Sequence, residues 1–238
     1  MKHFILTRYN CGWKPDVPIQ VKRMTTGGQV GAVEWLESRR KLFEAYCLPS
    51  IRAQTARDFR LILAVSKDTP TGYFDFLDRW SDINIELHAG SFGEPFKRSL
   101  FDRCGGGLLL TTRLDNDDAI APRFVERIRS VARTHASDEP LLIDVWGHQF
   151  LAGKNLFVVE NYGMQHASQY CSVLSTTSQY KWVFEDEHGK MPQAIERMVK
   201  IRESLYVTVI HEQNLGNHAF RGGDANMDWF LHYCPGNR

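Results

Sequence analysis

Short apolar runs alternate with helix-like segments in the first half of the chain, and this alternation constrains the fold most. The runs cover residues 4–7, 60–66 and 108–114, and residues 83–87 alternate in polarity as a strand does. Between them, apolar residues recur at helical spacing over 35–47 and 95–104. Strands alternating with helices predict an α/β fold, with a mostly parallel sheet flanked by helices.

The second half predicts fewer regular elements. Residues 122–135 predict a clear helix, because Pro122 stands in its first turn and an apolar stripe follows. We also expect Pro49 to end the 35–47 helix, and residues 212–238 to be irregular. The remaining expected elements are short helices at 73–80 and 191–203 and strands at 141–146, 156–160, 171–176 and 206–210.

The overall composition excludes several classes of protein. A net charge of +1 without a basic stripe argues against a nucleic-acid partner. The five cysteines form no CxxC pair and are odd in number, which indicates reduced thiols in a cytoplasmic protein. No stretch approaches the roughly 20 apolar residues of a membrane span, and residues 1–8 are too short an apolar run for a signal peptide. Peripheral membrane association and the oligomeric state stay open.

Three carboxylates, Asp115, Asp117 and Asp118, crowd into four residues between the strand at 108–114 and the helix at 122–135. Such carboxylates repel one another unless a cation or basic groups neutralise them. Mg²⁺ or Mn²⁺ held together with substrate phosphates is a common use of such a cluster. Arg8 and Asp68 also follow predicted strands. Because ligands bind at the carboxyl ends of strands in open α/β sheets, we expect all of these groups on one rim.

Several motifs together carry a resemblance to a known family. The segments that carry it are residues 4–10, 35–44, 47–51, 54–55, 58–59, 112–120 and 211–214. With these, the chain resembles GT-A fold, nucleotide-sugar-dependent glycosyltransferases, and is similar to the bacterial group labelled "putative rhamnosyl transferases". The resemblance implies a single GT-A-like (Rossmann-like) domain over 1–238, with a smaller mixed acceptor-side region. Residues 1–121 would form the nucleotide-sugar-binding half, which ends in a DxD motif, and 122–238 the acceptor-binding half.

The same resemblance implies the roles of the donor-side residues. Asp117 would bind Mn²⁺ or Mg²⁺, His211 would complete the metal site, and Asp115 would lie on the metal or nearer the sugar nucleotide. The other nucleotide-sugar-binding candidates are Arg8, Asp68, Arg98 and Asn116, with Arg98 preferred over Lys97. The alternative for the acidic motif is a solvated turn that caps the next helix. Asp118 would support either the metal or the loop, and Arg113 would pair with the carboxylates.

The acceptor side needs a carboxylate that removes a proton from the acceptor hydroxyl, if the reaction inverts the sugar carbon. The run 185–188 is the best local cluster, and the resemblance favours Asp186, then Glu187, as this catalytic base. An acidic helix N-terminus explains the same run equally well. The expected acceptor-side residues are Trp146, His148 and His188.

The expected function is a metal-dependent glycosyltransferase. It would move a sugar, with rhamnose one candidate, from a nucleoside-diphosphate donor to a hydroxyl acceptor such as a glycan, with inversion. A sugar nucleotidyltransferase is one alternative, although its usual Gly-rich phosphate loop is only weakly matched by Gly27-Gly28. A non-catalytic carbohydrate- or cation-binding module is another. An EF-hand is disfavoured because Ile120 occupies the position that demands Gly.

Overall fold

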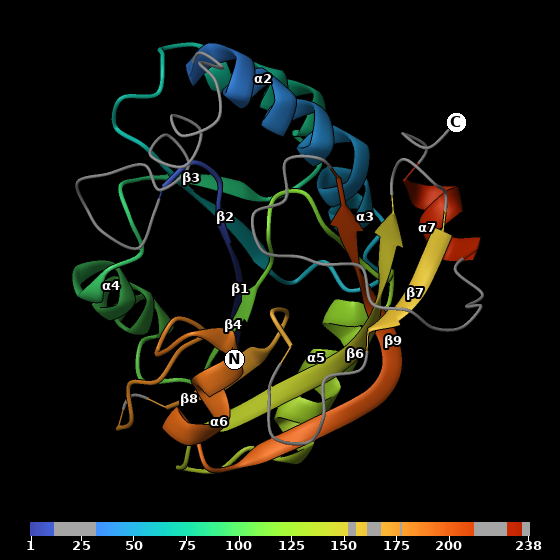
Figure 1. The fold of residues 1–238 in the computed structure, drawn as a ribbon. Coiled ribbons are helices and arrows are strands. Elements are labelled where there is room, and N and C mark those ends of the chain that lie inside the picture. The colour runs from blue at the N-terminus through green and yellow to red at the C-terminus, as the bar shows by residue number, and fades with distance from the viewer. Residues whose placement is uncertain (12–31, 152–155, 161–167, 177, 212–227, 235–238) are drawn as a thin grey trace.

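A mixed sheet forms the centre of the molecule in the computed structural model (Figure 1), which describes residues 1–11, 32–151, 156–160, 168–176, 178–211 and 228–234. The sheet has nine strands in the order β3-β2-β1-β4-β8-β6-β9-β5, and β7 pairs with β6. One continuous sheet therefore runs through both halves of the chain. Among the described residues, no helix is both long enough and apolar enough to cross a membrane.

The first four strands are all parallel, as the sequence predicts. They are β1 (Lys2–Arg8), β2 (Arg60–Val65), β3 (Ile85–Ala89) and β4 (Leu109–Arg113). Strand β1 pairs with β2 on one side and with β4 on the other, so the strand order reverses at β1. Ligands of open α/β sheets bind at such a switch point, outside the carboxyl ends of the strands.

The second half adds strands of mixed direction. They are β5 (Ala119–Ile120), β6 (Leu141–Leu151), β7 (Leu156–Glu160), β8 (Ser172–Ser175) and β9 (Met198–Ile210). Strand β8 joins β4 to β6 in antiparallel fashion, whereas β6 and β9 are parallel and pair over most of their length. The α/β class and the mixed second region are confirmed.

The helix expected over 191–203 is wrong. Only η3 (His188–Lys190) and α6 (Met191–Ala194) are helical there, and β9 has begun by Met198. From Val199 to Arg202 polar and apolar residues alternate, a period that suits a strand, and residues 199–201 pair with β6. The tertiary pairing overrides the weak helical propensity of the segment.

The first helical region continues past Pro49, contrary to the expectation. Helix α2 (Ala32–Leu42) leads through a π-helical turn, η1 (Phe43–Cys47), into α3 (Leu48–Arg52). Pro49 stands in the first turn of α3, where its missing N–H is not needed. The other helices are η2 (Tyr73–Trp80), α4 (Glu94–Cys104), α5 (Phe124–Thr134) and α7 (Asp228–Tyr233). Helix α7 lies in the region expected to be irregular.

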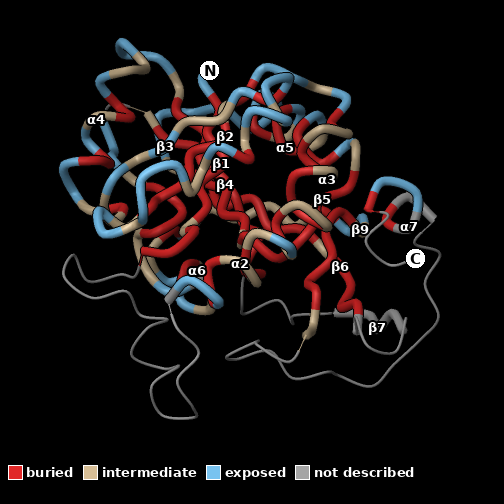
Figure 2. Tube along the Cα trace, turned by 90° about the horizontal axis from the view of Figure 1, so that it is seen from above, coloured by how far each residue is buried: buried red, intermediate tan, exposed pale blue. Residues whose placement is uncertain are grey.

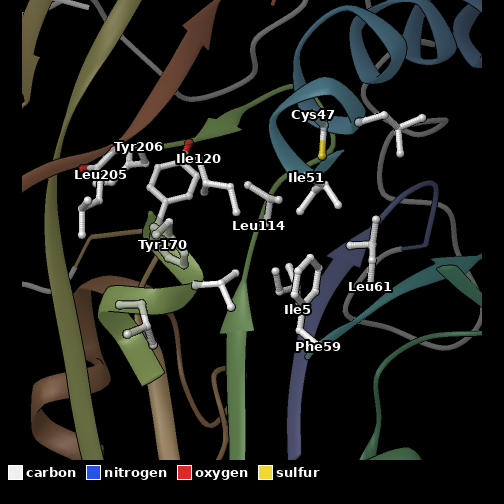
Figure 3. Packing of buried hydrophobic residues seen from close by; sticks show 14 of the residues in the cluster. Ile5, Cys47, Ile51, Phe59, Leu61, Leu114, Ile120, Tyr170, Leu205 and Tyr206 are labelled. Carbon is white, nitrogen blue, oxygen red and sulfur yellow. The ribbon is translucent and has the colours of Figure 1, made fainter. Parts of the chain in front are cut away.

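Apolar clusters cover both faces of the sheet, and the central strands are its most buried part (Figure 2). On one face, Ile5, Leu61 and Leu114 pack with Ile51 of α3 (Figure 3) and with α5. On the other face, α4 packs against a segment that contains Phe184. All five cysteines carry free thiols, as the sequence predicts.

Strands β6 and β9 meet at a bulge that only glycine fits. The register shifts on both sides of Trp146, and a Cβ on Gly147 would lie 2.5 Å from the ring of Tyr206. That ring packs on Tyr170, with 3.9 Å between the centroids. Gly147 thus allows an aromatic pair to fill the core beside the loop after β4.

Candidate active site

Two arginines stand at the switch point, one at the end of each central strand. Arg8 ends β1 and Arg113 ends β4, and their guanidinium carbons lie 5.4 and 6.0 Å from the ring centre of Phe184. Arg113 also pairs with Asp115 at 3.2 Å, as the sequence suggested. Burial first, and repulsion from Arg113 second, lower the pKa of Arg8 to about 10, although Asp115 opposes the shift. The carboxyl ends of β1 and β4 therefore hold two cations and one carboxylate, and this excess of positive charge suits the binding of an anion.

Asp117 brings together residues from distant parts of the chain. Its Oδ2 accepts hydrogen bonds from Arg39 Nη1 at 2.5 Å and His211 Nε2 at 2.9 Å. Burial alone would raise the pKa of Asp117, but the hydrogen bond from His211 and the charge of Arg39 outweigh it, so the pKa falls below its ordinary value. Asp117 is therefore a carboxylate at neutral pH. The expected meeting of Asp117 with His211 is present in the structure.

Arg39 was missed by the sequence reasoning. It lies in the motif at 35–44, next to a second arginine, and only its direction distinguishes the two. Arg39 is buried and reaches Asp117, whereas Arg40 pairs with Glu37 on the helix itself. The one signal available from sequence was an arginine on a helical face that also carries Trp35, over whose ring Arg39 lies at 5.3 Å.

Asn116 and Asp118 flank Asp117 and hold the acidic loop (residues 115–118) in place. Asn116 Nδ2 donates to the carbonyl oxygen of Tyr9 at 2.9 Å, which ties the loop to the end of β1. Asp118 accepts from the Tyr170 hydroxyl and, through Oδ1 at 2.7 Å, from the amide of Val209. Burial mainly raises the pKa of Asp118 well above its ordinary value, and repulsion from Asp117 and Asp115 adds to the rise. Of its two expected roles, Asp118 therefore takes loop support.

Asp68 lies in an exposed turn after β2, and this turn is tied to β1. Asn10 Oδ1 accepts from the amide of Ser66 at 2.8 Å, while its Nδ2 donates to Thr69 Oγ1 at 2.8 Å. Asp68 is near enough to Cys11 to contribute to the rise of that thiol's pKa to about 11, which burial mainly causes. The turn that carries Asp68 thus adjoins the chain directly after Arg8.

On helix α4 the buried cation is Lys97, the neighbour of the expected Arg98. Arg98 is exposed, whereas Lys97 is buried and its Nζ donates to Glu185 Oε2 at 2.9 Å. The buried ammonium thus holds the start of the acidic run at 185–188 against α4. Lys97, and not Arg98, is the α4 cation that faces the interior.

Within the acidic run, Asp186 differs from its neighbours. Glu185 pairs with Lys97 and with Lys181, the latter at 3.2 Å, and exposed Glu187 pairs with Lys190 at 3.3 Å. Asp186 is half-buried, accepts the amide of Glu187 at 2.7 Å and has no cationic partner within the described part of the chain. Asp186 lies two residues after Phe184, and the guanidinium groups of Arg8 and Arg113 both lie over the ring of Phe184.

The other acceptor-side candidates lie on or near β6. His148 is buried inside the sheet and is hydrogen-bonded through Nδ1 to Ser204, and burial lowers its pKa. Trp146 is half-buried at the bulge, and its Nε1 has no hydrogen-bond partner in the parts of the chain that are described. The side chain of His188 lies outside the described residues. The indole nitrogen of Trp146 is itself buried, so the structure does not present it to an acceptor.

Comparisons with known proteins identify the family and the fold. A family described as "Putative rhamnosyl transferase" matches residues 29–222. No curated protein matches the chain. Among solved structures, S. aureus TarS 1-349 in complex with UDP-GlcNAc matches with a TM-score of 0.53 and 13% identity, over 90% of this chain and 60% of that one. The complex of TarS 1-349 with UDP gives 0.51 and 12%, over 88% and 61%.

The chain thus spans about three-fifths of the TarS chains that it matches. At such low identity the likeness shows the fold, which is that of GT-A glycosyltransferases such as TarS. The family match covers well over half of the sequence. The chain therefore belongs to the putative rhamnosyl transferase family, and its fold is of the GT-A kind.

Proposed function

We propose that the chain transfers a sugar from a nucleoside-diphosphate donor to a hydroxyl group of an acceptor such as a glycan. One observation carries the proposal: Asp117 meets His211 in the loop after β4, and the same loop pairs with Arg113 through Asp115. Fixed cations and metal-ligating side chains are the groups that stabilise the negative charge of a departing diphosphate. The solved TarS chains were obtained with UDP and UDP-GlcNAc, which supports a sugar nucleotide as the donor.

The donor set at Asp117 fits a divalent cation. Asp117 Oδ2 and His211 Nε2 lie 2.9 Å apart, and a carboxylate with an imidazole suits Mn²⁺. Like Asp117, Asp115 pairs with an arginine, here Arg113, so either carboxylate would exchange part of an ion pair for the cation. Among the described residues, no three His, Cys, Asp or Glu gather into a metal site, so phosphate oxygens and water would complete the coordination. When bound there, the cation would supply positive charge opposite the departing diphosphate.

The protein's own residues then divide the work on the donor side. Arg8 and Arg113 hold the diphosphate through charge-assisted hydrogen bonds, which strengthen as negative charge develops on the leaving group. Arg39 keeps Asp117 ionised, as the lowered pKa of that carboxyl indicates. Asn116 and Asp118 fix the loop that presents Asp117, since each is bonded to a different strand end.

On the acceptor side, Asp186 is the proposed base. Its carboxylate takes the proton of the acceptor hydroxyl while that oxygen attacks the anomeric carbon. The bond from this carbon to the diphosphate breaks, and its electron pair leaves with the nucleoside diphosphate. Attack from the face opposite the leaving group inverts the carbon. The absence of a cationic partner among the described residues leaves Asp186 better suited to this role than Glu185 or Glu187.

Thermal unfolding with nucleotides tests the proposal. UDP, GDP and dTDP, and their sugar conjugates, would be added with and without Mn²⁺ to the wild type, to Asp117→Asn and to the exposed control Asp78→Asn. We expect Mn²⁺-dependent stabilisation by at least one sugar nucleotide, kept in Asp78→Asn and lost in Asp117→Asn. Slow hydrolysis of that donor would distinguish an enzyme from a binding module. No response to any nucleotide would contradict the proposal.

A further inference from the structure

A basic cavity lies at the amino ends of the parallel strands, whereas the candidate active site lies at their carboxyl ends. Its volume is about 400 Å³, and its lining residues stand at or just before the amino ends of β1, β2 and β3 and at the end of α4. Strand β1 has seven residues, so the two sites are about 20 Å apart. The lining residues are Lys2, His3, Phe4, Arg57, Asp58, Phe59, Arg60, Asn84 and Arg103.

The cations around this cavity outnumber the carboxylates. Asp58, the acidic residue of the lining, is already paired with Arg129 at 2.5 Å. Glu86 is shared between Arg60 at 2.9 Å and Arg103 at 2.7 Å, so this group of three keeps one positive charge. With Lys2 and Arg57 added, the walls carry an excess of positive charge.

Lys2 and Arg57 have no carboxylate at contact distance. Arg57 is exposed, and its side chain makes no hydrogen bond or ion pair with any described residue, acting on Asp82 only at longer range. The ammonium of Lys2 donates to the backbone oxygen of Arg103, and no carboxylate of the described chain pairs with it. Both therefore keep hydrogen-bond donors that face no protein anion.

His3 also lines the cavity. Its Nε2 lies 2.8 Å from Thr112 Oγ1, whereas its Nδ1 is buried and has no hydrogen-bond partner within the described residues. His3 is only 3% exposed, and buried polar atoms are seldom left without a partner. This nitrogen has almost no solvent contact, so it is a buried polar atom in the cavity wall and not one that is open to the ligand.

We propose that this cavity is a second anion site, which binds a phosphate or diphosphate group. Lys2 and Arg57 would donate to the phosphate oxygens, and guanidinium groups suit such oxygens in particular. Phe4 and Phe59 would pack against the organic part of the ligand. The volume lies in the range of small-ligand sites. The site does not depend on the glycosyl-transfer proposal, since it shares no residue with the donor rim.

Pyrophosphate titrations by calorimetry and by amide chemical shifts would test the site. In the wild type we expect shifts at residues 2–4 and 57–60. Arg57→Gln should weaken binding about tenfold or more, because a charge-assisted contact is lost. Arg133→Gln removes an equally exposed charge from α5 and should bind as the wild type does. Arg57→Gln should leave stabilisation by nucleotides unchanged, which separates this site from the donor rim.

Two arms identify the source of the phosphate. Phosphatidylcholine vesicles with phosphatidic acid would be compared with soluble pyrophosphate, each with the wild type, Lys2→Gln and Arg57→Gln. Vesicle binding that both substitutions weaken would assign the site to a lipid headgroup. Pyrophosphate binding alone, weakened in the same way, would assign it to a soluble phosphate compound. Shifts confined to the donor rim, or binding unaffected by both substitutions, would overturn the proposal.

Discussion

The buried pair of Arg39 and Asp117 makes Asp117→Asn a strong test of how the acidic loop is held. The two side chains are 8% and 11% exposed and lie 2.5 Å apart. Removing one partner of a buried ion pair costs about 3–5 kcal/mol, because the remaining charge stays buried without compensation. Asparagine keeps an oxygen that accepts from Arg39 and His211, so we expect the lower value, about 3 kcal/mol. Domains of this kind are stable by about 5–15 kcal/mol, so the loss is readily measured.

Urea denaturation at neutral pH, without added metal, measures this loss. The matched control is Asp82→Asn, because Asp82 also pairs with an arginine, Arg52, but on the surface, where such pairs contribute little. The double variant Arg39→Met/Asp117→Asn removes both buried charges and should recover much of the stability. The reasoning is refuted if Asp117→Asn loses no more stability than the control. It is equally refuted if the losses of the two single variants simply add in the double variant.

Three further changes have defined outcomes. Burial lowers the pKa of His3 to about 3 from an unfolded value of 6.5. Stability should therefore fall as the pH drops from about 6.5 towards 3, and His3→Gln should flatten this slope by up to about 1.4 kcal/mol per pH unit in urea denaturation. Gly147→Ala should cost about 1–3 kcal/mol by overpacking, and Tyr206→Leu should relieve it. Asp186→Asn should lower kcat by about 10²–10⁴-fold with an unchanged donor KM, whereas Glu187→Gln should retain activity. Equal losses in these last two variants would rule out Asp186 as the base.

Most of the parallel half of the fold could be predicted because β1, β2 and β4 are buried on both faces. Such strands read as continuous apolar runs, as in residues 4–7 and 60–66, and each ends in a polar segment. The order of strands and helices then places Arg8 and the acidic loop together at the carboxyl ends of the parallel strands. This part of the site follows from elements that are adjacent in the sequence.

The rest could not be predicted, because it depends on contacts between distant segments. Strand β9 alternates only weakly, and its pairing with β6 decides its conformation. Asp117 and Asp118 are neighbours in the sequence, yet one faces Arg39 and the other is locked inside the protein by Tyr170. Their roles differ because of residues that lie dozens of positions away, and no local pattern records those partners.

The anchoring of Asp118 limits how relatives of this chain can be recombined. Its partners Tyr170 and the Val209 amide lie in the second half of the chain, and Tyr170 also contacts Thr208 Oγ1 at 2.9 Å. A chimera joined near residue 121 would combine one parent's acidic loop with the other parent's Tyr170 and Thr208. Transfer of donor specificity between relatives should therefore succeed only when residues 168–170 and 206–209 move together with the loop.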